Sequence, residues 1–281
     1  MKTVIASYPY AMERVYSVTL SRLVGSLGDL VDEILVPAYV AGYAELPETE
    51  RQDAWPELLE RAISRLSFAA KDVIRAGQRA VPGVARNVAN TNRTGWRRWA
   101  DKLIGVNVFK SRGEAAWINP LVTSWSLENS KLISSISTQY LDQVAQRSQD
   151  MLRSGTSPKH FSVELARIYG ITMGRAKLIA RTEVAKLNGQ LTRARQMRLG
   201  ISIYIWSTSK DERVRPSHDA LEGKECLWDD PTVFRDPGGA WQKREGIGAY
   251  IGHPGTDFQC RCVSYADVES ALDELLQQPA A

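Results

Sequence analysis

The sequence predicts an α+β protein: a mainly helical, bundle-like N-terminal region, followed by a long basic helix and a small strand-and-loop C-terminal module. Apolar residues recur at three- and four-residue steps as far as Gly200, which is typical of one-sided helices. The period then changes to two at Ile201, Ile203 and Ile205, which is typical of a strand. Glycines and prolines interrupt the chain after His218, so the last module is rich in loops.

The first two predicted helices form a hairpin. An apolar stripe runs from Leu20 to Leu35, and Pro37 is expected to end that helix. A second stripe runs from Leu58 to Ile74, and Val81-Pro82-Gly83 is expected to end it. Each stripe needs an apolar partner, so we predict that the two helices pack together within a bundle.

Three further helices are predicted before the strand. They cover residues 120–154, 157–170 and 172–199. Thr172 is the expected N-cap of the last helix, and Gly200 is its expected stop signal. A closing strand is expected to begin at Cys262.

These elements predict four segments along the chain. They are a helical N-terminal region over 1–118, connecting helices over 119–170, the C-terminal module over 171–267, and a short helix or flexible tail over 268–281. A chain of 281 residues is long enough for one large domain or two ordinary ones with a hydrophobic core.

Composition narrows the class of protein further. No apolar run reaches about 18 residues, and the first ten residues lack the basic head and apolar centre of a signal peptide. We therefore expect no membrane contact and a cytoplasm-like compartment. Three cysteines are an odd count at low density, which argues against a disulfide framework and leaves free thiols or a metal site.

Positive charge gathers in two windows, which we interpret as candidate surfaces for the phosphates of double-stranded DNA. The window over 84–112 also carries Trp96 and Trp99, and the window over 172–199 contains a single acid, Glu183. The alternative interpretation is a solvated helix face with two structural tryptophans. The candidate nucleic-acid-binding residues are Arg86, Arg93, Arg97, Arg98, Lys102, Arg175, Lys177, Arg181, Lys186, Arg193, Arg195 and Arg198.

Histidine and cysteine gather in the last module in a pattern that suggests zinc. Cys260 and Cys262 form one close pair of ligands, and His218 and His253 form the other. Metal binding would stabilise a loop-rich module that has few apolar residues to form a core. Cys226 is left out of the proposed ligand set. The alternative is that the cysteines are small buried apolar residues and the histidines bond to turns.

The same cluster leaves an enzymatic alternative open. Cys260 or Cys262 with a histidine base would make a thiol hydrolase, and the histidines with Asp211 could hold the metal of a nuclease. The sequence has neither a nucleophile elbow nor a glycine-rich phosphate loop. No catalytic residue is therefore assigned, and we expect a protein that is not an enzyme.

Five short motifs follow one another between residues 157 and 266. They are Ala180-Arg181-Thr182-Glu183, Trp206, Asp211-Glu212-Arg213-Val214-Arg215-Pro216-Ser217-His218, Leu221-Glu222-Gly223, and Gly252-His253-Pro254 with Cys260-Arg261-Cys262. In this order they resemble the phage Mu protein F-like family of minor head proteins. The spacer from Pro254 to Gln259 is longer than is common in that family.

The resemblance implies a virion structural protein of a tailed bacteriophage with no established enzymatic activity. It implies a role in head morphogenesis and DNA packaging, and a location in the phage head near the portal, with the host cytoplasm as the place of assembly. The implied partners are the portal protein and the major capsid or scaffolding protein, with double-stranded DNA as a further candidate. Zinc is the one cofactor considered.

Overall fold

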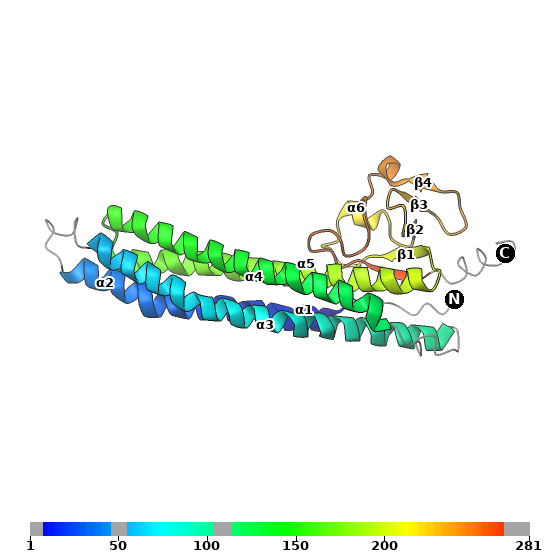
Figure 1. The fold of residues 1–281 in the computed structure, drawn as a ribbon. Coiled ribbons are helices and arrows are strands. Elements are labelled where there is room, and N and C mark those ends of the chain that lie inside the picture. Colours follow the sequence, from blue (N-terminus) through cyan, green and yellow to red (C-terminus); the bar gives the residue numbers. More distant parts are fainter. Residues whose placement is uncertain (1–7, 46–54, 104–113, 267–281) are drawn as a thin grey trace. The chain divides into compact units, whose positions relative to one another are not determined.

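A computed structural model of the protein describes residues 8–45, 55–103 and 114–266 (Figure 1). The chain divides into two compact units. The helical unit comprises Val15–Gly83 and Ser126–Ala180, and the mixed unit comprises Met1–Arg14, Val84–Trp125 and Arg181–Ala281. The helix or tail predicted over 268–281 lies outside the described residues.

Long helices make up most of the described chain, as the apolar stripes predict. They are α1 (Tyr10–Leu30), the π-helical turn η1 (Val31–Leu35), α2 (Val36–Glu45), α3 (Trp55–Leu103), α4 (Glu114–Arg153) and α5 (Pro158–Arg198). None of the described helices combines the length and the apolarity that crossing a membrane requires.

The core of the helical unit is built from the predicted stripes. The Tyr16 hydroxyl donates a hydrogen bond to Asn129 Oδ1 over 2.8 Å, which joins α1 to α4. The Tyr39 ring stacks on Phe161 with 3.7 Å between ring centroids, which joins α2 to α5. Fully or almost fully buried side chains of this unit include Leu20, Leu23, Leu27, Leu35, Leu59, Leu66, Ile133, Ile136 and Tyr140. The predicted bundle-like region is therefore confirmed.

The first helix does not end at Pro37, so that predicted boundary is wrong. The chain passes from α1 through η1 and continues through Pro37 as α2. Proline lacks a backbone N–H and is tolerated in the first turn of a helix, where that donor has no required partner. Pro37 is the second residue of α2, directly after a π-helical turn that changes the hydrogen-bond register.

Two other predicted breaks are also wrong. Helix α3 continues through Pro82 and Gly83, although an interior proline costs about 3 kcal/mol. The neighbouring Val81 and Ala85 are fully buried, and this burial offsets the weak local preference for helix. The helices predicted over 157–170 and 172–199 are one helix, α5, in which the Thr172 hydroxyl bonds back to a carbonyl one turn earlier instead of capping.

Gly189 lets α5 approach the loop around Pro254 very closely. A Cβ atom at position 189 would lie 2.6 Å from the Pro254 carbonyl oxygen, which is a backbone atom that cannot swing away. Gly189→Ala is therefore expected to destabilise the protein by about 1–3 kcal/mol. Gly174→Ala lies in the same helix with no neighbour within 4 Å, and it is expected to stabilise by up to about 1 kcal/mol. Urea unfolding of both variants measures the difference, and shifts of the same sign would contradict this close approach.

The strand-and-loop part, residues 203–266, is called the sheet module below. It contains β1 (Ile203–Ser207), α6 (Pro216–Asp219), β2 (Glu225–Leu227), β3 (Val233–Arg235), β4 (Gln242–Lys243), the 3₁₀ turn η2 (Arg244–Ile247) and β5 (Val263–Ala266). The strands form one antiparallel sheet in the order β4-β3-β2-β1-β5. The α+β class predicted from the sequence is thus confirmed.

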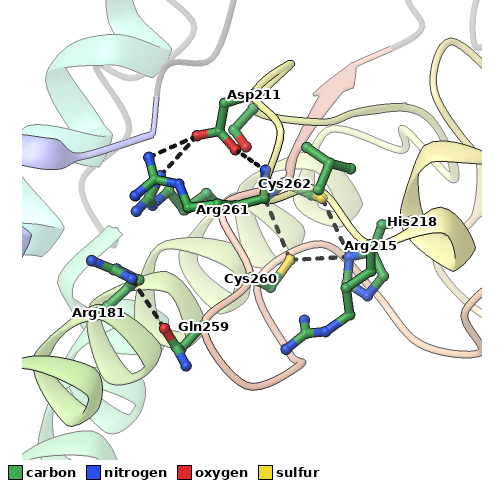
Figure 2. A pocket seen from close by; sticks show the side chains of 11 residues that line it. Arg181, Asp211, Arg215, His218, Gln259, Cys260, Arg261 and Cys262 are labelled. Carbon is green, nitrogen blue, oxygen red and sulfur yellow. Dashed lines mark hydrogen bonds and ion pairs between the residues drawn. The ribbon is translucent and has the colours of Figure 1, made fainter.

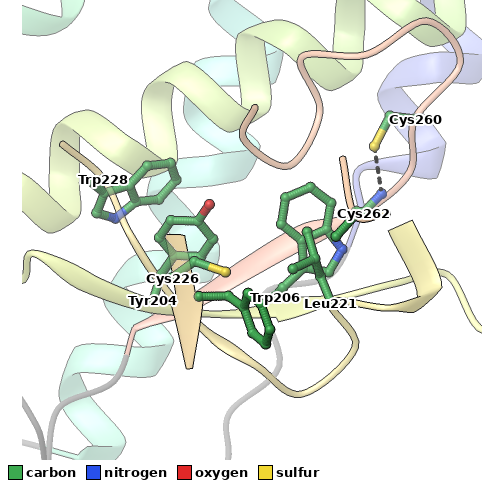
Figure 3. Close-up of a cluster of buried hydrophobic side chains, with 9 residues drawn as sticks. Tyr204, Trp206, Leu221, Cys226, Trp228, Cys260 and Cys262 are labelled. Atoms are coloured by element: carbon green, nitrogen blue, oxygen red, sulfur yellow. Dashed lines mark hydrogen bonds between the residues drawn. The ribbon is translucent and has the colours of Figure 1, made fainter. Parts of the chain in front are cut away.

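The aromatic face of β1 forms the core of the sheet module (Figure 3). Tyr204 and Trp206 alternate with the isoleucines of the strand and are both fully buried. Tyr204 lies opposite Cys226 of β2, and its ring lies 4.1 Å from the Trp228 ring. Cys260 belongs to the same buried cluster, so the loop before β5 is tied to the sheet.

A fully buried arginine, Arg244, holds the irregular loops of the sheet module against this core. Its guanidinium donates hydrogen bonds to the carbonyl oxygens of Val233, Tyr250 and Gly252 over 2.7 to 3.0 Å. The group also lies over the Trp206 ring, 5.6 Å from its centroid. A single side chain therefore satisfies carbonyls of three separate backbone positions.

Candidate functional site

Three of the four predicted zinc ligands meet at one point of the sheet module (Figure 2). His218 comes from α6, and Cys260 and Cys262 come from the loop that leads into β5. One side-chain nitrogen and the two sulfur atoms all lie within 4.8 Å of one another. All three residues are buried, although the residues between them along the chain form loops and short strands.

The imidazole of His218 links the two cysteines to a carboxylate. Its Nδ1 lies 3.4 Å from Cys262 Sγ and 3.6 Å from Cys260 Sγ. Its Nε2 lies 3.0 Å from Asp257 Oδ2. A carboxylate oxygen accepts hydrogen bonds, so Nε2–H is the donor of this bond to Asp257. The ring of Tyr250 stacks on the imidazole at 4.6 Å and fixes its plane.

The two thiols differ in their electrostatic surroundings. Cys260 Sγ accepts hydrogen bonds from the backbone N–H groups of Gly255 at 3.4 Å and Cys262 at 3.3 Å. A hydrogen bond from the Cys262 side chain, together with these backbone donors, lowers the pKa of Cys260 despite its burial. The same partnership and burial raise the pKa of Cys262. Of the two thiols, Cys260 is therefore the one that loses its proton more readily.

His253 lies outside this cluster, as does Cys226, which stands on β2 opposite Phe234. The Tyr204 hydroxyl lies 3.1 Å from His253 Nδ1, and the Trp228 ring is 5.0 Å from the imidazole. Burial, with the charges of Arg193 and Arg244 nearby, lowers the pKa of His253 to about 4. The imidazole is then neutral at pH 7, and the tyrosine hydroxyl donates to it.

This depressed pKa predicts acid sensitivity of a definite sign. His253 binds a proton near pH 6.5 in the unfolded chain but only near pH 4 in the folded protein, so stability is lost as the pH falls through this window. His253→Gln is expected to reduce the loss between pH 7 and pH 5, whereas His160→Gln at an exposed position leaves it unchanged. Urea unfolding at the two pH values measures the loss, and identical losses in wild type and His253→Gln would contradict the assignment.

A pocket of about 230 Å³ borders the cluster and is lined mainly by polar and charged side chains (Figure 2). Arg261 pairs with Asp211 over 3.0 Å, and Arg215 pairs with Asp257 over 3.0 Å. Arg181 of α5 reaches the same pocket and donates to Gln259 over 3.0 Å. The motifs around residues 181, 211–218 and 260–262 thus form one wall, although they are far apart in the sequence.

The structure separates the basic candidates of α3 into exposed and paired residues. Arg86, Arg97 and Arg98 are exposed, while Arg93 pairs with Glu114 over 3.2 Å. The side chains of Lys102 and Trp99 lie outside those that the structure describes. Trp96 is buried, as the alternative of a structural tryptophan requires.

The candidates on α5 divide in the same way. Arg175 and Lys177 of the helical unit are exposed. Arg193 and Arg198 of the mixed unit are also exposed, but Arg193 lies 4.0 Å from Asp229 and Arg198 lies over the Trp117 ring. Arg181 pairs with Glu13 over 3.0 Å, and Lys186 pairs with Glu183 over 2.8 Å.

Arg195 requires a correction, because its side chain is only 1% exposed. It donates to Glu114 over 2.8 Å and also bonds Asn92, which belongs to a buried polar network with Thr192. A guanidinium enclosed in this way is not displayed to a phosphate backbone. Arg195 therefore forms buried polar contacts inside the mixed unit.

Two important residues of the module were missed by the sequence reasoning. Asp257 lies inside the spacer between His253 and Cys260, where only its proximity to the cysteines could have drawn attention to it. Arg244 stands among exposed polar residues in the sequence, and no local pattern there predicts a buried cation.

Comparisons with known proteins agree with the motif order. Residues 142–265 match the family described as Phage Mu protein F like protein. The chain is 36% identical over 146 residues to a protein of Haemophilus influenzae described as an uncharacterized protein, an alignment that covers 52% of this chain and 29% of that relative. The aligned part of this chain therefore spans less than a third of that relative's length. No solved structure matches this chain. The resemblance carried by the five motifs is confirmed over residues 142–265, which match the Phage Mu protein F-like family.

Proposed function

We propose that this protein is a minor head protein of a tailed bacteriophage, acting in head morphogenesis and DNA packaging. The observation that carries the proposal is the family match over residues 142–265, since the family implies a phage head morphogenesis protein. The proposed location is the phage head near the portal, reached from the host cytoplasm during assembly. The proposed partners are the portal protein and the major capsid or scaffolding protein.

The match favours a structural role over the nuclease or thiol hydrolase alternative. The sheet module is held together by a buried aromatic core, the Arg244 hydrogen bonds and the His218 cluster. The cysteines that a hydrolase would use are 3% and 7% exposed at Cys260 and Cys262. These features suit a rigid docking unit, in which loops must hold one shape against a partner.

Inactivation of the gene in its own phage tests this role. An amber codon early in the gene is expected to abolish DNA-filled heads in a non-suppressing host, and the wild-type chain supplied in trans restores them. Electron microscopy of thin sections counts filled and empty heads. Lys243→Met, an exposed substitution, should restore heads as well as wild type, whereas Arg244→Met should not. A normal yield of filled heads without the chain would refute the role.

Contact with packaged DNA is a separate part of the proposal, supported by the exposed arginines of α3. Neutralising a phosphate releases counterions, so each lost contact lowers the slope of log affinity against log salt by about 1. The triple change Arg86→Ser, Arg97→Ser and Arg98→Ser is expected to lower that slope by about 3 on random-sequence duplex DNA. Fluorescence anisotropy measures the slope.

A matched control uses exposed arginines of α3 outside the basic window, Arg61 and Arg75, each of which pairs with a nearby acid. Changing both to serine should leave the slope unchanged. An equal slope in wild type and the triple variant would remove these residues from the DNA contact.

A further inference from the structure

We propose that His218, Cys260 and Cys262 bind one zinc ion through Nδ1 and the two Sγ atoms. The ligand set expected from the sequence also included His253. In the proposed site, the fourth coordination position has no protein ligand among the described residues. The inference rests on the geometry of these side chains and is independent of the proposed role in the phage head.

The two nitrogen–sulfur separations fit a zinc tetrahedron. Zinc lies about 2.3 Å from a thiolate sulfur and about 2.0 Å from an imidazole nitrogen, so at a tetrahedral angle the sulfur and nitrogen are about 3.5 Å apart. The observed separations from His218 Nδ1 are 3.4 Å to Cys262 and 3.6 Å to Cys260. An ion can therefore enter with little movement of the backbone.

The imidazole is already oriented as a ligand. When Nε2–H of His218 donates a hydrogen bond to Asp257 over 3.0 Å, this tautomer has its lone pair on Nδ1, the atom that faces both sulfurs. A carboxylate behind a coordinating histidine fixes its tautomer and raises its basicity. Stacking on Tyr250 and an edge contact with Trp206, 5.6 Å away, prevent the ring from turning.

Two thiols share a single imidazole lone pair in this arrangement. One lone pair on Nδ1 readily accepts one thiol proton, yet two sulfurs converge on it. A divalent ion at the centre would satisfy all three atoms. Binding releases the two thiol protons to solvent, and two thiolates balance the two positive charges of the ion. The buried site then carries no net charge.

The fourth position has a natural source of ligand. Among the described residues, the metal-ligating group comprises only these three side chains, and all of them line the 230 Å³ pocket. Water from the pocket can therefore complete the tetrahedron. The mixture of thiolate and imidazole favours zinc over magnesium or calcium, which prefer oxygen ligands.

The backbone supports the charged form of one ligand. The N–H groups of Gly255 and Cys262 both donate to Cys260 Sγ, and hydrogen bonds of this kind stabilise a thiolate. Gly255 has a φ of 85°, a conformation that disfavours side chains, and a Cβ there would lie 2.6 Å from the Ala185 carbonyl oxygen. Glycine at this position therefore allows the backbone conformation in which the Gly255 N–H donates to Cys260 Sγ.

The same three residues and Asp257 could be taken for a cysteine, histidine and aspartate triad of a hydrolase. A nucleophilic sulfur must be open to its substrate, but Cys260 is 3% exposed. A triad also needs only one sulfur, whereas Cys262 lies closer to the imidazole nitrogen than Cys260 does. A metal site uses both thiols as ligands, whereas a hydrolase would have no use for the second thiol.

Metal analysis of the purified full-length chain tests the proposal. After reconstitution with zinc under reducing conditions and exhaustive dialysis, mass spectrometry is expected to find about one zinc per chain. Cys260→Ser and Cys262→Ser should each reduce the bound zinc at least tenfold. Cys226→Ser and His253→Gln are the matched controls and should retain it, since both residues lie outside the cluster.

Cobalt gives a second measurement that does not depend on folded variants. Wild-type protein loaded with Co²⁺ should show thiolate charge-transfer bands and the visible bands of a tetrahedral ion, and added zinc should abolish them. Asp257→Asn should keep the site but weaken zinc binding by about 10–100-fold in competition with a chromophoric chelator. Arg213→Gln, an exposed change on the pocket wall, should leave the affinity unchanged.

Three outcomes would overturn the proposal. The first is wild-type protein that remains free of zinc after reconstitution. The second is loss of zinc on changing His253 but not His218. The third is rapid alkylation of Cys260 by iodoacetamide at neutral pH that zinc does not slow, which would favour a nucleophilic thiol.

Discussion

Replacement of Arg244 by methionine is expected to lower the free energy of unfolding by about 3–5 kcal/mol, the largest effect of any single change considered. Methionine fills much of the same space but donates no hydrogen bonds. The carbonyls of Val233, Tyr250 and Gly252 would each lose a donor inside a buried region. Each unsatisfied buried acceptor costs about 1–3 kcal/mol, reduced where water can enter.

The neighbouring Lys243 provides the control for this change. It is exposed on β4, so Lys243→Met should alter the free energy of unfolding by less than about 0.5 kcal/mol. Chemical denaturation followed by tryptophan fluorescence suits the measurement, because Arg244 lies over the Trp206 ring. If Arg244→Met were as stable as Lys243→Met, the loops of the sheet module would not depend on this guanidinium.

Replacement of Arg195 by leucine is the second large expected effect, a destabilisation of about 2–4 kcal/mol. It would remove the buried partner of Glu114 and one member of the network around Asn92. Removing one member of a buried ion pair leaves the other charge uncompensated. Glu114 retains its pair with Arg93 over 3.2 Å, which keeps the expected loss below the upper end of the usual range.

Arg198 is the matched control for Arg195, because it lies less than one turn further along α5 and is exposed. Arg198→Leu loses only an exposed contact with the Trp117 ring and should change the free energy of unfolding by less than about 1 kcal/mol. Thermal and urea denaturation would reveal the difference. The interior role of Arg195 would be wrong if the two leucine variants lost stability equally.

The sequence predicts the sheet module well where the pattern is local. Alternation of isoleucine with Tyr204 and Trp206 marks β1, and both aromatic rings lie in the core as a strand with an aromatic face requires. The meeting of His218 with Cys260 and Cys262 can also be predicted from the sequence, because the two cysteines are only two residues apart and share a preference for zinc with histidine. His253 shares their chemistry, but the fold directs it to Tyr204 instead.

Helix boundaries are predicted less well because tertiary packing outweighs local signals. Pro37, Pro82 and Gly170 are ordinary stop signals, and the chain remains helical at all three. Local preferences of one or a few kcal/mol lose to the burial of long apolar stripes. Arg195 shows the same limit for function, since a basic residue in a basic window looks exposed until its partner, Glu114, is known.

Cryo-electron microscopy of the intact phage particle is the most direct test of the proposed role in the phage head. Density for this chain is expected inside the head at the portal vertex, with residues 142–265, which match the Mu F-like family, in contact with portal or capsid protein. Particles that contain filled heads but no density or peptides from this chain would contradict it.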